Sequence, residues 1–356
     1  MNFQTILDSW LRIPNKSFHR DSVVDHDQIH CDCSGLIALL FDELQLKKPY
    51  GLDRPKAVHY FALLQEIGSD RIDKLLPGNL LAWRKNQLPK SGDTGHVLVI
   101  DDVPVEVAKH RFQVSVVDAT KKANGLSRRI IELHTDDSEK IIGVRLHLSG
   151  DKSDAKVKRT AIYHHPLVNS RFCWGCGLPS RVCNCSAIEV SLKTPAIVIL
   201  RHPKERKRTL STVSLIKQRY PNVLVLEGEQ FTPLRIPNLA LLFPSDDILS
   251  EQGEGNSDQT LILIDATWRK AKRMLHLNPW LQALPKVSLS PQRLSDYLLR
   301  KVSSDENLSS VEAFAAAAND RVLAGALKPF MDKHIQLMGE DVYQRNYKNH
   351  LNYVDS

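Results

Sequence analysis

In the second half of the chain, short apolar runs alternate with polar loops and with segments of helical periodicity. Each run is short and ends in a turn or loop, which favours a β-strand over a buried helix. Strands that alternate with helices form a mainly parallel sheet with helices on both faces. The predicted strands are 196–200 (AIVIL), 222–228 (NVLVLEG), 239–243 (LALLF), 261–265 (LILID) and 286–290 (KVSLS).

One of these strands carries an acid at its end. Its apolar run stops at Asp265, and Thr267 and Trp268 then open a helical pattern that Ala271 and Leu275 continue. Open α/β sheets bind ligands at the carboxyl ends of their strands. A carboxylate that ends a buried strand needs a cation, a backbone amide or a ligand as its partner. We therefore expect Asp265 at a ligand site, where Thr267 either contacts the ligand or caps the helix, and Trp268 either lines the site or packs in the core.

The first half carries a cysteine, a histidine and an aspartate on separate predicted elements. Cys33 stands where a small polar turn leads into the helical pattern 36–44, and the partial positive charge of a helix start favours a thiolate. His96 begins the apolar strand 95–100, and Asp118 lies just past another apolar run. These are the parts of a nucleophile, a general base and an orienting group. The plainer alternative makes Cys33 a small packed residue and Asp118 a turn cap.

Apolar content drops over 148–160, where short polar and charged residues take over, as is typical of a linker. With 356 residues the chain is long enough for two domains, each with its own core. We therefore predict one domain over 1–150 and an α/β domain over 160–356, whose sheet core spans 190–335.

The start of the second domain holds four cysteines within a short segment rich in glycine and proline. Their first pair has C-x-x-C spacing, and four thiolates can surround one tetrahedral ion and leave no open position. We therefore predict a structural Zn²⁺ in a knuckle over 173–185, with free or redox cysteines as the alternative. The ligands would be Cys173, Cys176, Cys183 and Cys185.

Basic side chains cluster twice beside the predicted ligand edge. The net charge of +7 favours an acidic partner such as nucleic acid. One cluster follows the first predicted strand, at 201–208, and the other lies in the helix after Asp265. Such runs are either solvated surface or a track for phosphates, and their shared edge favours the second interpretation. The predicted RNA contacts are Arg201, Lys204, Arg206, Lys207, Arg208, Arg269, Lys270 and Arg273.

The composition is that of a globular protein, which excludes the disordered and fibrous classes. No apolar run reaches the length that crosses a bilayer, and the first residues lack the pattern of a signal peptide. We therefore expect a cytoplasmic protein without membrane contact.

The first domain resembles NlpC-type, papain-like cysteine hydrolases. The resemblance rests on DCSGL at 32–36, on PGN at 77–79 before a strand, and on GHVLVI at 95–100. It implies an α+β papain-like fold and a cysteine amidase or peptidase, with Cys33 as nucleophile, His96 as base and Asp118 as third residue. The chain departs from the family where Asn79 replaces a commoner aspartate and Asp118 a frequent histidine.

The second domain resembles the DTW-domain family, because its motifs occur in that family's order. They are the cysteine array, HPKE with its basic tail, LLFPS, DATW, YLLRK and LSSVEAFA. The resemblance implies a SPOUT-like fold and transfer of the 3-amino-3-carboxypropyl group of S-adenosylmethionine to N3 of a tRNA uridine. By this analogy Asp265, Thr267 and Trp268 form the catalytic centre, and the cofactor contacts are Thr212, Pro244, Ser245 and Arg300.

Three alternatives stay open at this point. The same fold and cofactor could transfer a methyl group to RNA. The chain could be a cysteine hydrolase whose second half is an RNA-binding module. It could also be a non-catalytic RNA-binding protein that is held together by zinc.

Overall fold

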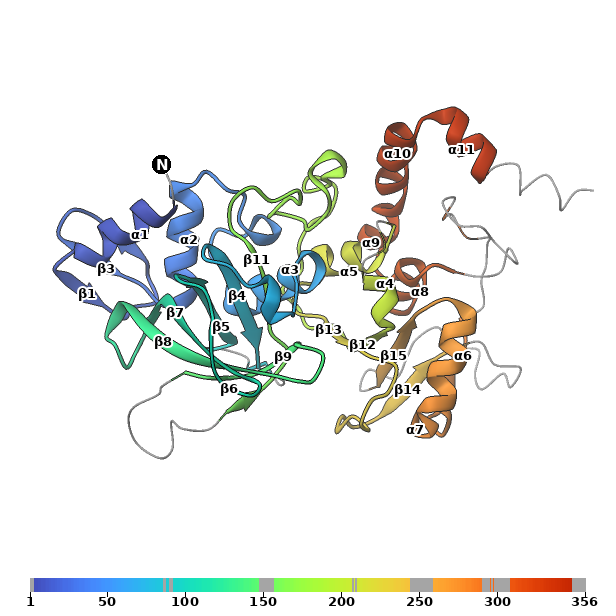
Figure 1. Ribbon diagram of the computed structural model, residues 1–356. Helices are drawn as coiled ribbons and strands as arrows, with labels where there is room; N and C mark the ends of the chain where they lie inside the picture. The colour runs from blue at the N-terminus through green and yellow to red at the C-terminus, as the bar shows by residue number, and fades with distance from the viewer. Residues whose placement is uncertain are drawn as a thin grey trace, which may run out of the picture. The chain divides into compact units, whose positions relative to one another are not determined.

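The computed structural model describes residues 3–85, 88–89, 92–146, 157–206, 208, 210–243, 259–289, 295, 297 and 308–347. The chain forms two compact units, Met1–Cys183 and Asn184–Ser356, and each is described by itself (Figure 1). In the part of the chain that the structure describes, no helix has the length and apolar character needed to span a membrane.

Unit 1 is built on an antiparallel sheet of eight strands. In pairing order they are β10 (Lys158–Arg159), β9 (Ile141–Arg145), β8 (Gly125–Thr135), β7 (Arg111–Thr120), β5 (Gly95–Ile100), β4 (Asn79–Arg84) and β11 (Tyr163–Pro166), with β6 (Val105–Ala108) paired to β7. A small sheet precedes it, in the order β1 (Asn15–Ser17), β3 (Gln28–His30) and β2 (Val23–Val24). The helices are α1 (Phe3–Arg12), α2 (Cys33–Glu43) and α3 (Ala57–Ile67), with 3-10 turns at η1 (Pro49–Gly51), η2 (Ile72–Lys74) and η3 (Ser180–Val182).

The predicted helix after Cys33 and the strand that begins at His96 are confirmed by α2 and β5. Asp32 caps α2, because its carboxylate accepts a hydrogen bond of 2.7 Å from the amide of Gly35. A Cβ at Gly35 would lie 1.8 Å from Oγ of Ser22, so a larger residue here requires the Ser22 side chain to move. The DCSG turn thus fixes the direction in which Cys33 leaves the helix start.

Unit 1 extends beyond the predicted linker. β11 pairs antiparallel with β4 along Tyr163–Pro166, and β10 pairs with β9. The predicted domain boundary therefore differs from the structural one, since residues 158–183 pack with the first unit. The drop in apolar content marks a connection between two strands of this unit, and a single sequence does not show which sheet takes up the strand that follows.

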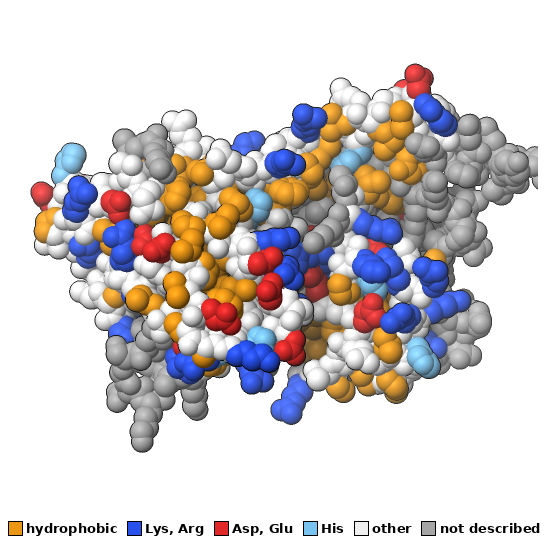
Figure 2. Space-filling view, in the orientation of Figure 1, with side chains coloured by type: hydrophobic (Ala, Val, Ile, Leu, Met, Phe, Trp, Pro, Cys, Tyr) orange, Lys and Arg blue, Asp and Glu red, His pale blue; other side chains and the backbone are white. Residues whose placement is uncertain are grey.

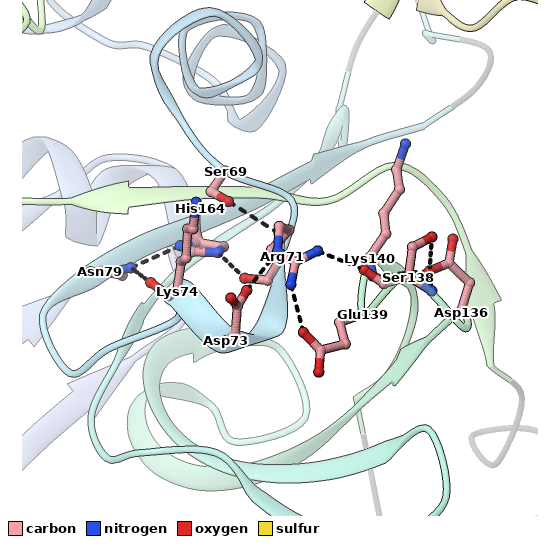
Figure 3. Close-up of polar contacts among 10 residues, drawn as sticks. All are labelled: Ser69, Arg71, Asp73, Lys74, Asn79, Asp136, Ser138, Glu139, Lys140 and His164. Atoms are coloured by element: carbon pink, nitrogen blue, oxygen red, sulfur yellow. Dashed lines mark hydrogen bonds and ion pairs between the residues drawn. The ribbon is translucent and has the colours of Figure 1, made fainter.

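His164 attaches β11 to the rest of unit 1. Its Nε2 donates to the carbonyl of Arg71 at 2.8 Å, and the Asn79 amide lies 2.8 Å from its Nδ1 (Figure 3). The ring is 1 % exposed and neutral in this arrangement, since Nδ1 accepts from the Asn79 amide nitrogen. An aspartate at position 79 has no such donor. The amide of Asn79 is therefore matched to a buried histidine.

Unit 2 is built on a parallel sheet of five strands. Their order is β13 (Leu224–Glu227), β12 (Ile197–Arg201), β15 (Thr260–Asp265), β14 (Leu239–Leu242) and β16 (Lys286–Val287), and every pairing is parallel. All five predicted strands lie in this sheet, which confirms the predicted parallel architecture.

Both faces of this sheet are covered. Val198 and Ile262 pack with Met274 of α6 (Trp268–Leu277) and Leu281 of α7 (Pro279–Gln282) on one face. The alternate residues of the same strands, such as Ile199, are also buried, and α8 (Ser310–Ala317) contacts β15. Burial of both alternating sets is typical of a strand inside an α/β sheet. The other helices are α4 (Pro203–Arg206), α5 (Val213–Arg219), α9 (Arg321–Gly325), α10 (Leu327–Met338) and α11 (Glu340–Asn346).

Candidate functional site

Charged residues meet at the carboxyl edge of the parallel sheet. Arg201 ends β12 and is the register partner of Glu227 on one side and of Asp265 on the other. Its guanidinium lies 2.6 Å from the Glu227 carboxylate, and Arg206 reaches the other oxygen of that carboxylate at 3.3 Å. Arg201 is fully buried, and the Arg206 side chain is only 7 % exposed. Both arginines were predicted as RNA contacts, but their burial and pairing make them part of the sheet edge.

The Asp265 carboxylate accepts a hydrogen bond from a residue far away in the sequence. Ser310, the first residue of α8, donates a hydrogen bond of 2.6 Å to its Oδ1. Asp265 is 8 % exposed, and its Oδ1 is paired with a hydroxyl, which is none of the three predicted partners, a cation, a backbone amide or a ligand. The backbone carbonyl of Asp265 also accepts from the amide of His202 at 3.0 Å. Nothing local in the sequence indicated that Ser310 contacts Asp265.

Further motifs meet at the start of α8. Thr212 Oγ1 accepts a hydrogen bond of 3.3 Å from the amide of Val311. A capping box of Ser309 and Glu312 begins α8. Ser295, before the YLLRK motif, donates to Glu312 at 2.7 Å. The HPKE, DATW and LSSVEAFA segments thus converge on one edge of one sheet, which is where ligands bind in such folds.

The two residues after this edge are half-buried. Thr267 is the N-cap residue of α6, with its carbonyl accepting from Ala271 at 2.8 Å, and its hydroxyl makes no capping hydrogen bond. Trp268 packs edge-to-face against Phe243, with ring centroids 5.4 Å apart. Of the predicted cofactor contacts, Thr212 lies at this edge. Pro244, Ser245 and Arg300 lie outside the described residues.

The two basic clusters are joined by a buried acid. Glu205 of α4 lies 2.6 Å from Lys270 and 3.0 Å from Arg208, and its side chain is 9 % exposed. The predicted loop 201–208 therefore contains the helical turn α4. The exposed cations of this part of the unit are Lys204, Arg208, Arg269, Lys272 and Arg273, and we call them the basic patch (Figure 2). Lys207 lies outside the described residues.

The four cysteines of the predicted knuckle converge. The Sγ atoms of Cys173, Cys176, Cys183 and Cys185 all lie within 4.8 Å of one another. The Cys176–Cys183 and Cys173–Cys183 sulfur distances are 3.8 Å and 3.5 Å. Four sulfurs about 2.3 Å from one tetrahedral ion would be about 3.8 Å apart, so the array fits Zn²⁺. Gly177, at a φ of +74°, turns the chain between the two halves of the array.

The knuckle is anchored on unit 1. The Trp174 ring meets Phe41 of α2 edge-to-face at 5.2 Å, and its indole nitrogen donates to the carbonyl of Leu167 at 3.0 Å. The amide of Tyr50 donates to the carbonyl of Gly175 at 2.7 Å. An ion that orders this segment would therefore also support the helix that carries Cys33.

The predicted cysteine, histidine and aspartate of unit 1 are brought together. His96 is close enough to Cys33 for this thiol to raise its pKa, and its Nε2 lies 2.6 Å from Oδ2 of Asp118. Asp118 is fully buried and also accepts two hydrogen bonds from Arg129, one of them 2.9 Å long. Cys31 is fully buried, and burial raises the pKa of its thiol to about 12, so it is a packed neighbour. Sequence reasoning missed Arg129.

The electrostatics of this group favour an ion pair. Burial alone would lower the pKa of His96, but the negative charge of Cys33 and hydrogen bonds to Asp118 and Cys33 raise it to about 10. Burial would likewise raise the pKa of Asp118, yet hydrogen bonds from His96 and Arg129 lower it to about 2. The arrangement therefore places a protonated His96 beside the Cys33 sulfur, and a cation beside a thiol favours the thiolate, the reactive form of a cysteine nucleophile.

Comparison with known proteins relates the second part of the chain to one family. Residues 170–326 match the DTW domain. Over 180 residues the chain is 31% identical to tRNA-uridine aminocarboxypropyltransferase 2 of Drosophila melanogaster, covering 46% of this chain and 72% of that protein. It is 29% identical over 163 residues to the mouse (Mus musculus) protein of the same name, covering 41% of this chain and 54% of the relative. Tested against solved structures, the chain has no match. The chain therefore belongs to the DTW-domain family.

Proposed function

We propose that the protein transfers the 3-amino-3-carboxypropyl group of S-adenosylmethionine to N3 of a tRNA uridine and leaves methylthioadenosine. The observation that carries this proposal is the Ser310–Asp265 contact, which joins two distant motifs of the family region at the ligand edge of a parallel sheet. The names of the relatives add the reaction and the substrate class. The SPOUT-like fold and the cytoplasmic location expected from the sequence agree with this activity.

The reaction forms a bond between N3 and a carbon of the donor, breaks the bond from that carbon to sulfur, and releases the N3 proton. The bound S-adenosylmethionine supplies a carbon made electrophilic by the positively charged sulfur. Asp265 takes the N3 proton or orients the N3–H group, and Ser310 holds its carboxylate. Thr267 and Trp268 shape the pocket beside it, and Thr212 positions the start of α8.

Nucleoside mass spectrometry after incubation with unmodified tRNA and labelled S-adenosylmethionine tests the proposal. We expect a modified uridine that carries the mass of the aminocarboxypropyl group. A methyl mass instead would establish the methyltransferase alternative. Demonstrated tRNA binding without any consumption of S-adenosylmethionine would overturn the proposal and favour a non-catalytic RNA-binding protein.

We propose that the basic patch binds tRNA through its phosphates. Replacing Arg269 and Lys272 by glutamate should weaken tRNA binding, because two exposed cations become anions. Each lost phosphate contact should also reduce the steepness of the slope of log binding constant against log salt concentration by about 0.7 to 0.9. Binding titrations at several salt concentrations measure both effects. Lys328→Glu is the matched control, since Lys328 is an exposed cation of the same unit on α10. An equal loss in the control would contradict a specific patch.

A second activity is favoured by the Cys33, His96 and Asp118 geometry. We propose that unit 1 is a papain-like thiol enzyme, an amidase or peptidase, in which Cys33 attacks a carbonyl carbon and His96 transfers protons. Asp118 holds the imidazole by the 2.6 Å contact to its Nε2. Its substrate class follows only from the chemistry of a thiolate nucleophile.

Alkylation by iodoacetamide tests this site without a known substrate. His96 keeps its proton below pH about 10, and a cation beside a cysteine makes its sulfur more nucleophilic. At about pH 6 we expect Cys33 to react more than tenfold faster than an ordinary thiol with a pKa of about 8.5. Cys31 should stay unmodified, because it is buried and its thiol pKa is raised to about 12. Peptide mass mapping distinguishes the two. An ordinary thiol profile for Cys33 would contradict the proposal.

A further inference from the structure

Arg129 contacts the group formed by Cys33, His96 and Asp118 through hydrogen bonds to the Asp118 carboxylate. Its Nε donates to Oδ1 of Asp118 at 2.9 Å, and Nη2 donates to Oδ2, the oxygen that also faces His96. The remaining nitrogen, Nη1, donates to the carbonyl of Leu146. The side chain is 15 % exposed. All three nitrogens of the guanidinium are therefore engaged, and the group is held in one orientation.

The register of the sheet explains why an arginine stands here. In the antiparallel pair of β7 and β8, Asp118 lies opposite Ser127, and Arg129 lies opposite Val116. Arg129 and Asp118 are thus diagonal neighbours on adjacent strands, within reach of a long side chain. A guanidinium can grip both oxygens of a carboxylate with two parallel hydrogen bonds, which lysine cannot do.

We propose that Arg129 is a positioning residue of the Cys33 site. It fixes the Asp118 carboxylate so that His96 is held by its Nε2 and turns its other ring nitrogen toward Cys33. The inference rests on the thiol activity proposed above. It assigns to Arg129 a role that acts through Asp118 and involves no contact with a substrate.

The burial of Asp118 gives this role its physical basis. Asp118 is 0 % exposed, and a buried carboxylate is costly unless several donors compensate it. His96 and Arg129 are the charged groups that act on Asp118, while Cys33 and Asp118 are those that act on His96. Without Arg129, the carboxyl group either takes up a proton or turns away. In both cases the imidazolium loses its partner, and the Cys33 thiolate becomes less stable.

The pH profile of Cys33 alkylation in the full chain tests the inference. For Arg129→Gln we expect the midpoint to rise by about one pH unit, which is about a tenfold slower reaction on the acidic limb. Arg129→Lys keeps the positive charge but loses the paired hydrogen bonds of the guanidinium to Asp118, so it should also raise the midpoint. If the glutamine variant does not fold, the lysine variant alone tests the inference. No shift in the lysine variant, or a downward shift in either variant, would overturn the inference.

The neighbouring arginine provides a matched control. Arg128 is the preceding residue of β8, and its side chain pairs with Asp8 and Asp101. Arg128→Gln should leave the midpoint unchanged, and an equal shift there would show that any lost arginine on this strand has the same effect.

A double variant checks that Arg129 acts through Asp118. Asp118→Asn alone should raise the midpoint, and adding Arg129→Gln should raise it no further, because the carboxylate to be positioned is already gone. Additive shifts would overturn the inference. If wild-type Cys33 reacts as an ordinary thiol, the thiol activity and the role of Arg129 both fail. If wild-type Cys33 shows the expected high reactivity and the Arg129 variants have the same midpoint as the wild type, only the role of Arg129 fails.

Discussion

Asp265→Asn is expected to lower the rate of aminocarboxypropyl transfer to tRNA by about 10²- to 10⁴-fold, the usual loss when a general acid or base is removed. The asparagine keeps the size of the side chain, and its oxygen can still accept a hydrogen bond from the hydroxyl of Ser310. It cannot take a proton, and it lacks the charge that orients the N3–H group. Single-turnover transfer with saturating S-adenosylmethionine measures the effect. The affinity for tRNA should stay within about a factor of two, because Asp265 is buried and is not one of the exposed cations of the basic patch.

Asp320 offers a matched control for the loss of a buried carboxylate. It is also 8 % exposed, lies in the same unit, and pairs with Arg219 at 2.8 Å while capping α9. Asp320→Asn should cost about 1–3 kcal/mol of unfolding free energy and leave the transfer rate of the folded protein unchanged. If Asp265→Asn retains wild-type transfer, or if both variants lose it equally, Asp265 is not a reacting group.

Removal of the metal from the cysteine knuckle is expected to destabilise unit 1. Purified protein should contain about one zinc per chain, and chelation should lower the melting temperature of this unit by about 10 °C if the ion contributes about 4 kcal/mol. The effect should reach α2, since Trp174 of the knuckle packs on Phe41 of that helix. Hydrogen exchange measured with and without chelator should therefore rise in α2 and near Tyr50.

Cysteine variants control for this experiment. Cys176→Ser should lose the metal and reproduce the faster exchange in α2, because it removes one of the four converging sulfurs. Cys33→Ala, at the start of the same helix, should retain the metal. Metal analysis that finds no zinc in protein with intact, reduced thiols would mean that the knuckle is a set of free cysteines.

The strands of unit 2 were predictable because their burial is visible in the sequence. A strand buried on both faces is a continuous apolar run, and each of the five runs that were predicted lies in the parallel sheet. The helix start after Cys33 and the strand of His96 were predictable for a similar reason. The long pair of β7 and β8 was seen only in part, since exposed residues such as Ile130 interrupt its pattern.

The partners within each site could not be predicted, because they depend on pairing across long stretches of chain. Ser310 reaches Asp265 from 45 residues away, and nothing local distinguishes its hydroxyl from that of Ser309. Arg201 was predicted as an RNA contact, which requires an accessible side chain, and charged side chains are usually exposed. Its burial follows from Glu227, which the parallel register places beside it. Arg129 was missed for the same reason.

The pairing of β11 with unit 1, which His164 supports, limits where the chain could be cut if the DTW region were joined to a different protein. A cut before the start of the family match at residue 170 keeps β11 with β4, but a cut in the predicted linker leaves β4 as an open edge, prone to pair with other chains. A cut after Cys183, at the end of unit 1, separates Cys185 from the other three sulfurs. A break just before residue 170 leaves the sheet whole and keeps all four cysteines on the same side. The two halves can therefore be recombined with other partners at this point, and what the break removes is the packing of Trp174 on Phe41.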